Sequence, residues 1–200
     1  MSVELESLKP ADFDSFSAIT TAAYQANYGD VDESMARHIL DSHARGCDKV
    51  GYMTLRKEVF LVRCEGRPMG FTTLTWKRGG SAKTGPTILF PESRGKGIGP
   101  QVQLALQRLV GARGGRKTYG TVSEANVRAQ KYMLRAGYEI ETRLREHYNP
   151  DRTEIIFGRL LSPGPAAPAA AAAPAVDESK VLRAVPAGAS DILFNSARLI

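Results

Sequence analysis

The feature that most constrains the fold is an apolar segment that runs into a glycine-rich loop and then into an amphipathic helix. Residues 87–90 suit a buried strand, Pro91 ends it, and glycines alternate over residues 95–99. Apolar residues then recur on one helical face over 100–110. Glycine admits positive φ and lets the backbone approach a ligand closely. A strand, a glycine loop and a helix N-terminus together predict an anion site in an α/β protein.

Apolar periodicity predicts the other elements of the chain. Alternation of apolar and polar residues indicates strands, and apolar residues three or four positions apart indicate helices. The strands are expected at 3–8, 59–64, 69–76, 87–90, 119–122, 138–145 and 154–161, and the helices at 10–26, 31–45, 100–110 and 126–136. Because helices and strands are intermixed along the chain, the order predicts an α/β fold with a mixed sheet.

The composition changes sharply after Leu161. Ala or Pro occupies 12 of the 15 positions in residues 162–176, a stretch that has no charge and little to bury. We therefore expect a folded domain over 1–161, a semi-rigid linker over 162–176 and a C-terminal tail over 177–200. The expected domain is long enough for one good hydrophobic core.

Charge and cysteine content narrow the class of protein. Residues 51–150 hold 18 basic and 7 acidic side chains, a net charge of +11, but the sequence contains no base-stacking or helix-turn-helix motif. Nucleic acid is therefore not an expected partner. No apolar run is long enough to span a membrane, and the first residues do not resemble a signal peptide. Two cysteines provide neither a disulfide framework nor a zinc site, so we expect a reduced, cytoplasmic protein without a metal.

Three phosphate-binding patterns can be compared with the glycine-rich loop. A P-loop requires a lysine followed by Ser or Thr, whereas Gly97 follows Lys96. A dinucleotide fingerprint requires a third glycine, where this chain has Val102. The pattern R-x-x-G-x-G is satisfied by Arg94, Gly97 and Gly99.

A second segment strengthens the third pattern. Asn126 and Ala129 begin the fourth expected helix, and Gly137-Tyr138 follows it. Together with the R-G-K-G-I-G loop, this segment resembles the acyl-CoA-binding motifs of the GNAT N-acetyltransferases, over residues 3–161. The resemblance implies a GNAT-like α/β fold with a mixed, mostly antiparallel sheet, flanked by helices and splayed between strands four and five. It also implies an acyl-CoA-dependent N-acetyltransferase that uses acetyl-CoA or another acyl-CoA.

The resemblance further implies where CoA binds. The pantetheine arm is expected in the gap beside strand four, on Thr87, Ile88 and Leu89. Asn126 is expected near the thiol end, with a helix cap as its alternative role. Pro100 has no N–H, so Gln101 is expected as the next donor. The residues expected at the pyrophosphate are Arg94, Gly95, Lys96, Gly97, Ile98, Gly99 and Gln101.

The acid and base that the family often uses are out of register here. The tyrosine expected seven residues after Asn126 is Met133, and the glutamate expected five residues before it is Thr121. Tyr132 lies about 100° away around the helix, so core packing competes with catalysis as its role. The candidate catalytic residues are Glu124 and Tyr132. The alternatives are Glu92, Asp30 and Glu33 as bases acting through water, and Tyr138, Tyr148 and Tyr28 as acids.

The acceptor side is expected in the first two helices and their loop. Tyr28, Asp30 and Glu33 combine an aromatic ring with carboxylates, which suits a cationic amine, and a solvated helix start is the alternative. The expected acceptor is an amine of a small molecule or a peptide, and the chain is a candidate homodimer. The alternative function is a non-catalytic GNAT-like module that binds acyl-CoA or a partner protein.

Overall fold

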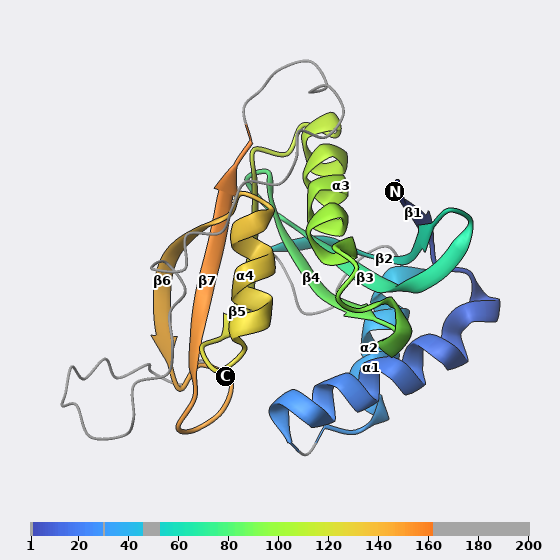
Figure 1. Ribbon diagram of the computed structural model, residues 1–200, viewed down its shortest axis with the longest axis horizontal. Coiled ribbons are helices and arrows are strands. Elements are labelled where there is room, and N and C mark those ends of the chain that lie inside the picture. The colour runs from blue at the N-terminus through green and yellow to red at the C-terminus, as the bar shows by residue number, and fades with distance from the viewer. Residues whose placement is uncertain (1, 30, 46–52, 162–200) are drawn as a thin grey trace.

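The computed structural model describes residues 2–29, 31–45 and 53–161, so the expected linker and tail lie outside the described residues. Within the described residues, seven strands form one sheet in the order β1-β2-β3-β4-β5-β7-β6 (Figure 1). Only β4 and β5 run parallel within this described sheet. The strands are β1 (Val3–Ser7), β2 (Thr54–Cys64), β3 (Arg67–Lys77), β4 (Ser81–Leu89), β5 (Lys117–Ser123), β6 (Glu139–Arg145) and β7 (Thr153–Leu160).

The helices and strands follow the order predicted from the sequence. β4 is longer than expected, because it begins at Ser81 rather than at residue 87. Gly85 and Pro86 weaken the strand pattern there, but pairing with β3 supplies the ladder that the local sequence does not indicate. None of the described helices is long and apolar enough to cross a membrane. The α-helices are α1 (Phe13–Tyr28), α2 (Glu33–Ala44), α3 (Ile98–Ala112) and α4 (Val127–Arg135), with short 3₁₀ turns at Pro10–Asp12 and Pro91–Ser93.

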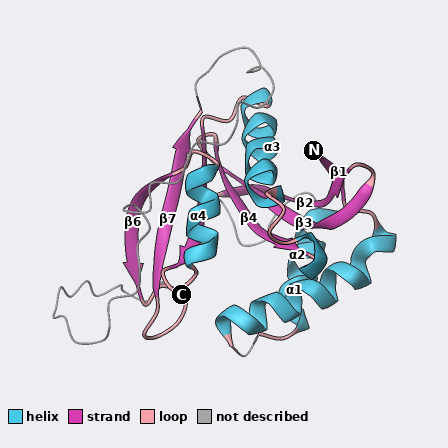
Figure 2. Ribbon diagram, in the orientation of Figure 1, coloured by secondary structure: helices cyan, strands magenta, loops and turns pink. Residues whose placement is uncertain are grey.

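The helices cover opposite faces of the sheet (Figure 2). Alternate residues of a strand point to opposite faces, and in β2 Val59 packs with α1 and α2 whereas Phe60 packs with α3. Gln107 of α3 donates a hydrogen bond of 2.9 Å to the carbonyl of Ala136 at the end of α4, so these two helices share a face. We refer below to the α1/α2 face and the α3/α4 face.

The two parallel strands separate soon after they pair. β4 and β5 are in register only from Ser81–Lys83 to Lys117–Tyr119. Residues 84–89 of β4 have no partner in β5 within the described sheet, whereas β5 continues to pair with β7. Two residues of β4 oppose the single Thr73 of β3, which is a bulge at the start of the separation. The splayed, mostly antiparallel sheet predicted from the sequence is therefore confirmed.

Candidate functional site

The glycine-rich loop joins β4 to α3 and turns at two glycines. Gly95 and Gly97 have φ of +79° and +74°, a conformation that favours glycine. α3 begins at Ile98, so the N–H groups of its first turn lack helical partners. Among the described residues, no N–H group of residues 95–97 donates to a backbone carbonyl. The loop therefore presents free N–H groups and the positive end of a helix dipole, an arrangement that binds phosphate.

Basic side chains surround this loop. Nε of Arg94 donates to the carbonyl of Leu89 at 3.1 Å, which ties the loop to the end of β4. Lys96 is exposed. Arg128 of α4 also approaches, since a Cβ built on Gly95 lies 3.9 Å from its Nη2. Arg128 was not predicted from the sequence, because α4 is separated from the loop by α3 and β5 and the approach of Arg128 depends on how α4 packs.

The first turn of α3 shows which of the predicted N–H donors are free to bind a ligand. Gln101 is the fourth residue of this helix, so its N–H is the first that can bond within it, to the carbonyl of Gly97. The free donors are those of Ile98 and Gly99. A Cβ built on Gly99 lies 3.7 Å from the ring of Tyr132, so α4 packs closely against this turn. Pyrophosphate binding by Gln101 stays a prediction.

The part of β4 that is not paired with β5 leads into the loop. Oγ1 of Thr87 lies 2.8 Å from Oγ1 of Thr72 and accepts from Nε2 of Gln103 at 3.3 Å, on the α3/α4 face. Ile88 and Leu89 pair with β3 alone in the described sheet. The opposite backbone edge of this segment faces the gap between β4 and β5. Such an edge can bond to the amides of an extended ligand, and the predicted contacts with pantetheine depend on it.

A buried polar network connects this gap to the helices. The hydroxyl of Tyr138 donates to Oε1 of Gln103 at 3.0 Å and lies 3.3 Å from Oγ1 of Thr84. Nε2 of Gln103 lies 3.5 Å from the hydroxyl of Tyr132. Burial raises the pKa of Tyr132 to about 12 and also raises the pKa of Tyr138. Both phenols are therefore neutral at physiological pH and bonded to protein groups.

Both predicted catalytic residues have partners within the protein. Glu124 follows β5 and forms an ion pair with Arg143 of β6. The hydroxyl of Tyr132 belongs to the network just described. Met133, which occupies the register of the family's usual acid, is 1% exposed and packs in the core with Val122. Catalysis by Glu124 or Tyr132 stays a prediction.

Asn126 is the N-terminal cap of α4. Its Oδ1 accepts from the N–H of Ala129 at 3.0 Å. The capping role that the sequence offered as an alternative is confirmed, and a contact of Asn126 with CoA stays a prediction. At the other end of the helix, Gly137 has a φ of +77°, which permits the sharp turn into β6.

On the α1/α2 face, the predicted acceptor residues lie at the helix ends. The carbonyl of Tyr28, the last residue of α1, accepts from Nδ2 of Asn149 at 3.4 Å. Oε1 of Glu33, the first residue of α2, accepts from the Ser17 hydroxyl at 3.1 Å, so this carboxylate joins the two helices. Asp30 lies outside the described residues. Acceptor binding by all three stays a prediction.

Tyr148, in the loop between β6 and β7, spans the two separating strands. Its hydroxyl accepts from Nζ of Lys83 at 3.0 Å and lies 3.3 Å from Oγ1 of Thr121. Lys83 belongs to β4 and Thr121 to β5. The ring of Tyr148 also packs edge-on against that of Tyr28, with centroids 6.0 Å apart. Lys83 was not predicted, because no local pattern indicates a contact between such distant segments.

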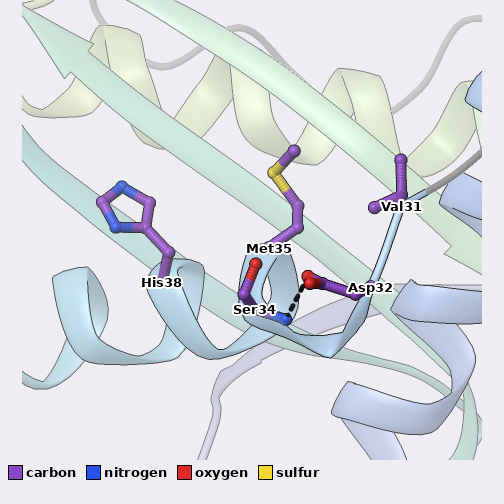
Figure 3. Close-up of a pocket in the computed structure, with 5 residues that line it drawn as sticks. All are labelled: Val31, Asp32, Ser34, Met35 and His38. Carbon is purple, nitrogen blue, oxygen red and sulfur yellow. Dashed lines mark hydrogen bonds between the residues drawn. The ribbon is translucent and has the colours of Figure 1, made fainter.

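An open cavity of about 450 Å³ lies at the start of α2 (Figure 3). Figure 3 shows the carboxylate of Asp32 turned back onto the N–H of Ser34, from which it accepts at 2.8 Å. Asp32 is therefore a helix cap rather than a group free for a ligand. Across the described residues, no cluster of three or more His, Cys, Asp or Glu side chains could hold a metal ion. The cavity is lined by Val31, Asp32, Ser34, Met35 and His38.

Comparison with known proteins identifies the fold. No protein-family model and no curated protein matches this sequence. Among solved structures, spermidine N-acetyltransferase from Vibrio cholerae, in complex with CoA and spermine, is similar at a TM-score of 0.64 and 16% identity, over 80% of this chain and 95% of that one. Ribosomal-protein-alanine N-acetyltransferase from Brucella melitensis is similar at 0.63 and 17% identity, over 79% and 99%. A Desulfovibrio desulfuricans protein described as a GNAT-family acetyltransferase is similar at 0.64 and 15% identity, over 80% and 99%. The chain therefore has the GNAT N-acetyltransferase fold, as the sequence motifs predicted.

Proposed function

We propose that the protein is an acyl-CoA-dependent N-acyltransferase that moves an acetyl or other acyl group to an amine. The observation on which this rests is the junction of a free anion-binding loop with an open strand edge. The N–H groups around Gly97 and Ile98 suit a pyrophosphate, and the part of β4 that is not paired with β5 ends at Leu89, shortly before the loop. CoA, in which a pyrophosphate is joined to an extended pantetheine arm, is the kind of ligand that needs both.

The reaction requires positioning more than a strong acid. A neutral amine attacks the thioester carbonyl, and a backbone N–H of β4 at the gap can stabilise the oxyanion. Orientation of the two reactants alone contributes several kcal/mol. Because a thiol has a pKa of about 8–9, a thiolate leaves without strong protonation. The core position of Met133 is therefore compatible with turnover.

The names of similar solved structures support amine acylation. One of them binds CoA and spermine, and another acts on the alanine of a ribosomal protein. From these names we carry over to this protein only the reaction class. In that class, an amine of a small molecule or a peptide is the acceptor. We expect the reaction to occur in the cytoplasm.

Two measurements test the proposal. Calorimetry with CoA is expected to show binding, and release of free thiol from acetyl-CoA is expected to depend on an added amine. Longer acyl-CoAs belong in the same assay, because the described residues of β4 do not define the acyl length. Failure to bind CoA contradicts the proposal.

A non-catalytic module that binds acyl-CoA is the second candidate function. The observation in its favour is that Met133 replaces the usual acid and that Tyr132 is bonded within the protein. CoA binding with no amine-dependent thiol release across a broad amine panel would favour this candidate.

A further inference from the structure

The α1/α2 face holds a buried carboxyl group to which no role has been assigned above. Glu154 of β7 pairs with Ser123 of β5 and is only 1% exposed. Its Oε2 is buried and has no hydrogen-bond partner in the described part of the protein. Buried carboxylates are normally paired or hydrogen-bonded, because desolvation is otherwise costly. The unpartnered oxygen therefore points to a ligand that donates to it.

Strand register determines the face on which Glu154 lies. Its neighbour Ile155 pairs with Val122 and packs with α4. Adjacent residues of a strand point to opposite faces, so the carboxyl group of Glu154 is on the α1/α2 face. Electrostatic interactions with Tyr28 of α1 and Lys83 of β4 agree with this placement. Glu154 therefore lies across the sheet from the glycine loop, near the end of β5 that has separated from β4.

Tyrosine rings gather on the same face. The ring centroids of Tyr24 and Tyr28 are 5.7 Å apart, and Tyr28 in turn contacts Tyr148 at 6.0 Å. Tyr119 of β5 also interacts electrostatically with Tyr148. Burial raises the pKa of Tyr24 to about 12 and raises the pKa of Tyr28 and Tyr119. Neutral aromatic rings near a carboxylate favour an ammonium group.

We propose that Glu154 binds the ammonium group of the acceptor and accepts its proton, and that the acceptor is a primary amine with a single positive charge. This inference rests on the proposed N-acyltransferase function. The amine enters from the α1/α2 face, and acyl-CoA lies on the α3/α4 face. The two reactants meet through the gap between β4 and β5, where Tyr148 bonds to Lys83 and Thr121.

The proton transfers balance in this arrangement. The ammonium group gives one proton to the Glu154 carboxylate, which later releases it to solvent. The neutral amine then forms the new C–N bond, and the C–S bond of the thioester breaks. The second proton leaves the nitrogen and appears on the departing thiolate, which gives free CoA and the amide. Burial raises the pKa of Glu154, so this carboxylate is a better proton acceptor than an exposed one.

Nearby cations determine the charge of the acceptor. Burial raises the pKa of Glu154, and the charges of Lys83 and Arg152 oppose that shift, so both cations act on the same site. A second ammonium group beside Glu154 would be repelled by these two positive charges, because like charges near a desolvated site raise each other's energy. The site therefore favours a monoamine over a polyamine.

The test compares Glu154→Gln with a matched control. Glu139→Gln removes an exposed carboxylate from the same sheet, on β6. Binding of phenethylamine is followed by the shifts of tyrosine ring resonances, first without CoA, and KM is measured by thiol release from acetyl-CoA. We expect Glu154→Gln to weaken amine binding and raise KM at least tenfold, as loss of a charged hydrogen bond does. Glu139→Gln is expected to match the wild type, and CoA affinity to stay unchanged in both variants.

Each outcome decides the proposal. An unchanged amine KM in Glu154→Gln overturns it, as does a wild-type preference for spermidine over phenethylamine or the absence of phenethylamine binding at millimolar concentration. If Glu154→Gln does not fold, Glu154→Asp keeps the charge on a shorter side chain, and a raised amine KM with normal CoA affinity supports the proposal. Absence of CoA binding in the wild type contradicts the proposed function instead, because amine binding is measured separately.

Discussion

The two faces of the splayed sheet assemble their polar groups in different ways. On the α3/α4 face, the groups proposed to bind phosphate are backbone N–H groups of one contiguous loop, residues 95–99. On the α1/α2 face, the polar groups are side chains from distant segments, including Lys83 of β4, Tyr148 of the β6–β7 loop and Glu154 of β7. The first face needs a local conformation, whereas the second needs the correct pairing of strands.

This difference suits the two proposed ligands. CoA has a constant pyrophosphate, and main-chain donors at a helix start recognise it without a particular side chain. Acceptor amines vary in size and charge, and side chains on separate elements can differ without disturbing the loop. Substitutions should therefore separate into those that affect CoA binding and those that affect the acceptor.

The largest expected effect is on CoA binding by the loop. Gly97→Val places a β-branched residue at a φ of +74° and should weaken CoA binding at least tenfold, about 1.4 kcal/mol, while the domain stays folded. Gly99→Val should act in the same direction by crowding Tyr132, 3.7 Å from its Cβ. Gly111→Val, in the same helix with open space around its Cβ, is the control. Calorimetry that shows unchanged CoA binding in Gly97→Val would remove the loop from the site.

A smaller effect is expected on the acceptor side. Tyr148→Phe removes the hydroxyl that bonds to Lys83 and Thr121 and should lower kcat/KM for the amine about three- to tenfold, as loss of one hydrogen bond does. CoA affinity should not change. A parallel loss of CoA affinity would show that the two faces are not independent.

The change of protein stability with pH tests whether the carboxyl group of Glu154 is desolvated. Burial raises its pKa above the ordinary value of 4.5, so the folded state holds this proton to higher pH than the unfolded state does. The wild type should therefore lose stability relative to Glu154→Gln as pH rises above about 4.5. Urea unfolding at pH 4 and pH 7 measures the difference. A difference that does not grow with pH would show that Glu154 is not desolvated.

The smallest effect is expected for Tyr132→Phe. Its hydroxyl lies in the buried network with Gln103, and the ring packs against Gly99. Turnover should stay within a few-fold of the wild type, measured by thiol release. A fall of 100-fold or more would identify Tyr132 as the acid and would move catalysis to the α3/α4 face.

Local patterns predicted the elements of the fold but not all of their bounds. The order of helices and strands, the glycine loop and the cap at Asn126 depend on neighbours in the sequence, and the structure has each of them. The beginning of β4 at Ser81 was not predicted from the sequence, because the ladder with β3 overrides the weak local strand pattern around Gly85. Arg128 also escaped prediction, because its approach to Gly95 depends on how α4 packs.

The sequence by itself determined the loop, because positive φ at Gly95 and Gly97 is a local requirement written in consecutive residues. The helix after the loop was also predicted, although it begins at Ile98, two residues before the expected start at Pro100. Only the tertiary structure decided where Glu154 lies. Its pairing with Ser123 sets the face to which its carboxyl group points, and a shift of one residue would turn it to the other side. The meeting of Tyr148 with Lys83 and Thr121 has the same origin, since strand pairing and loop placement bring together groups that no sequence interval connects.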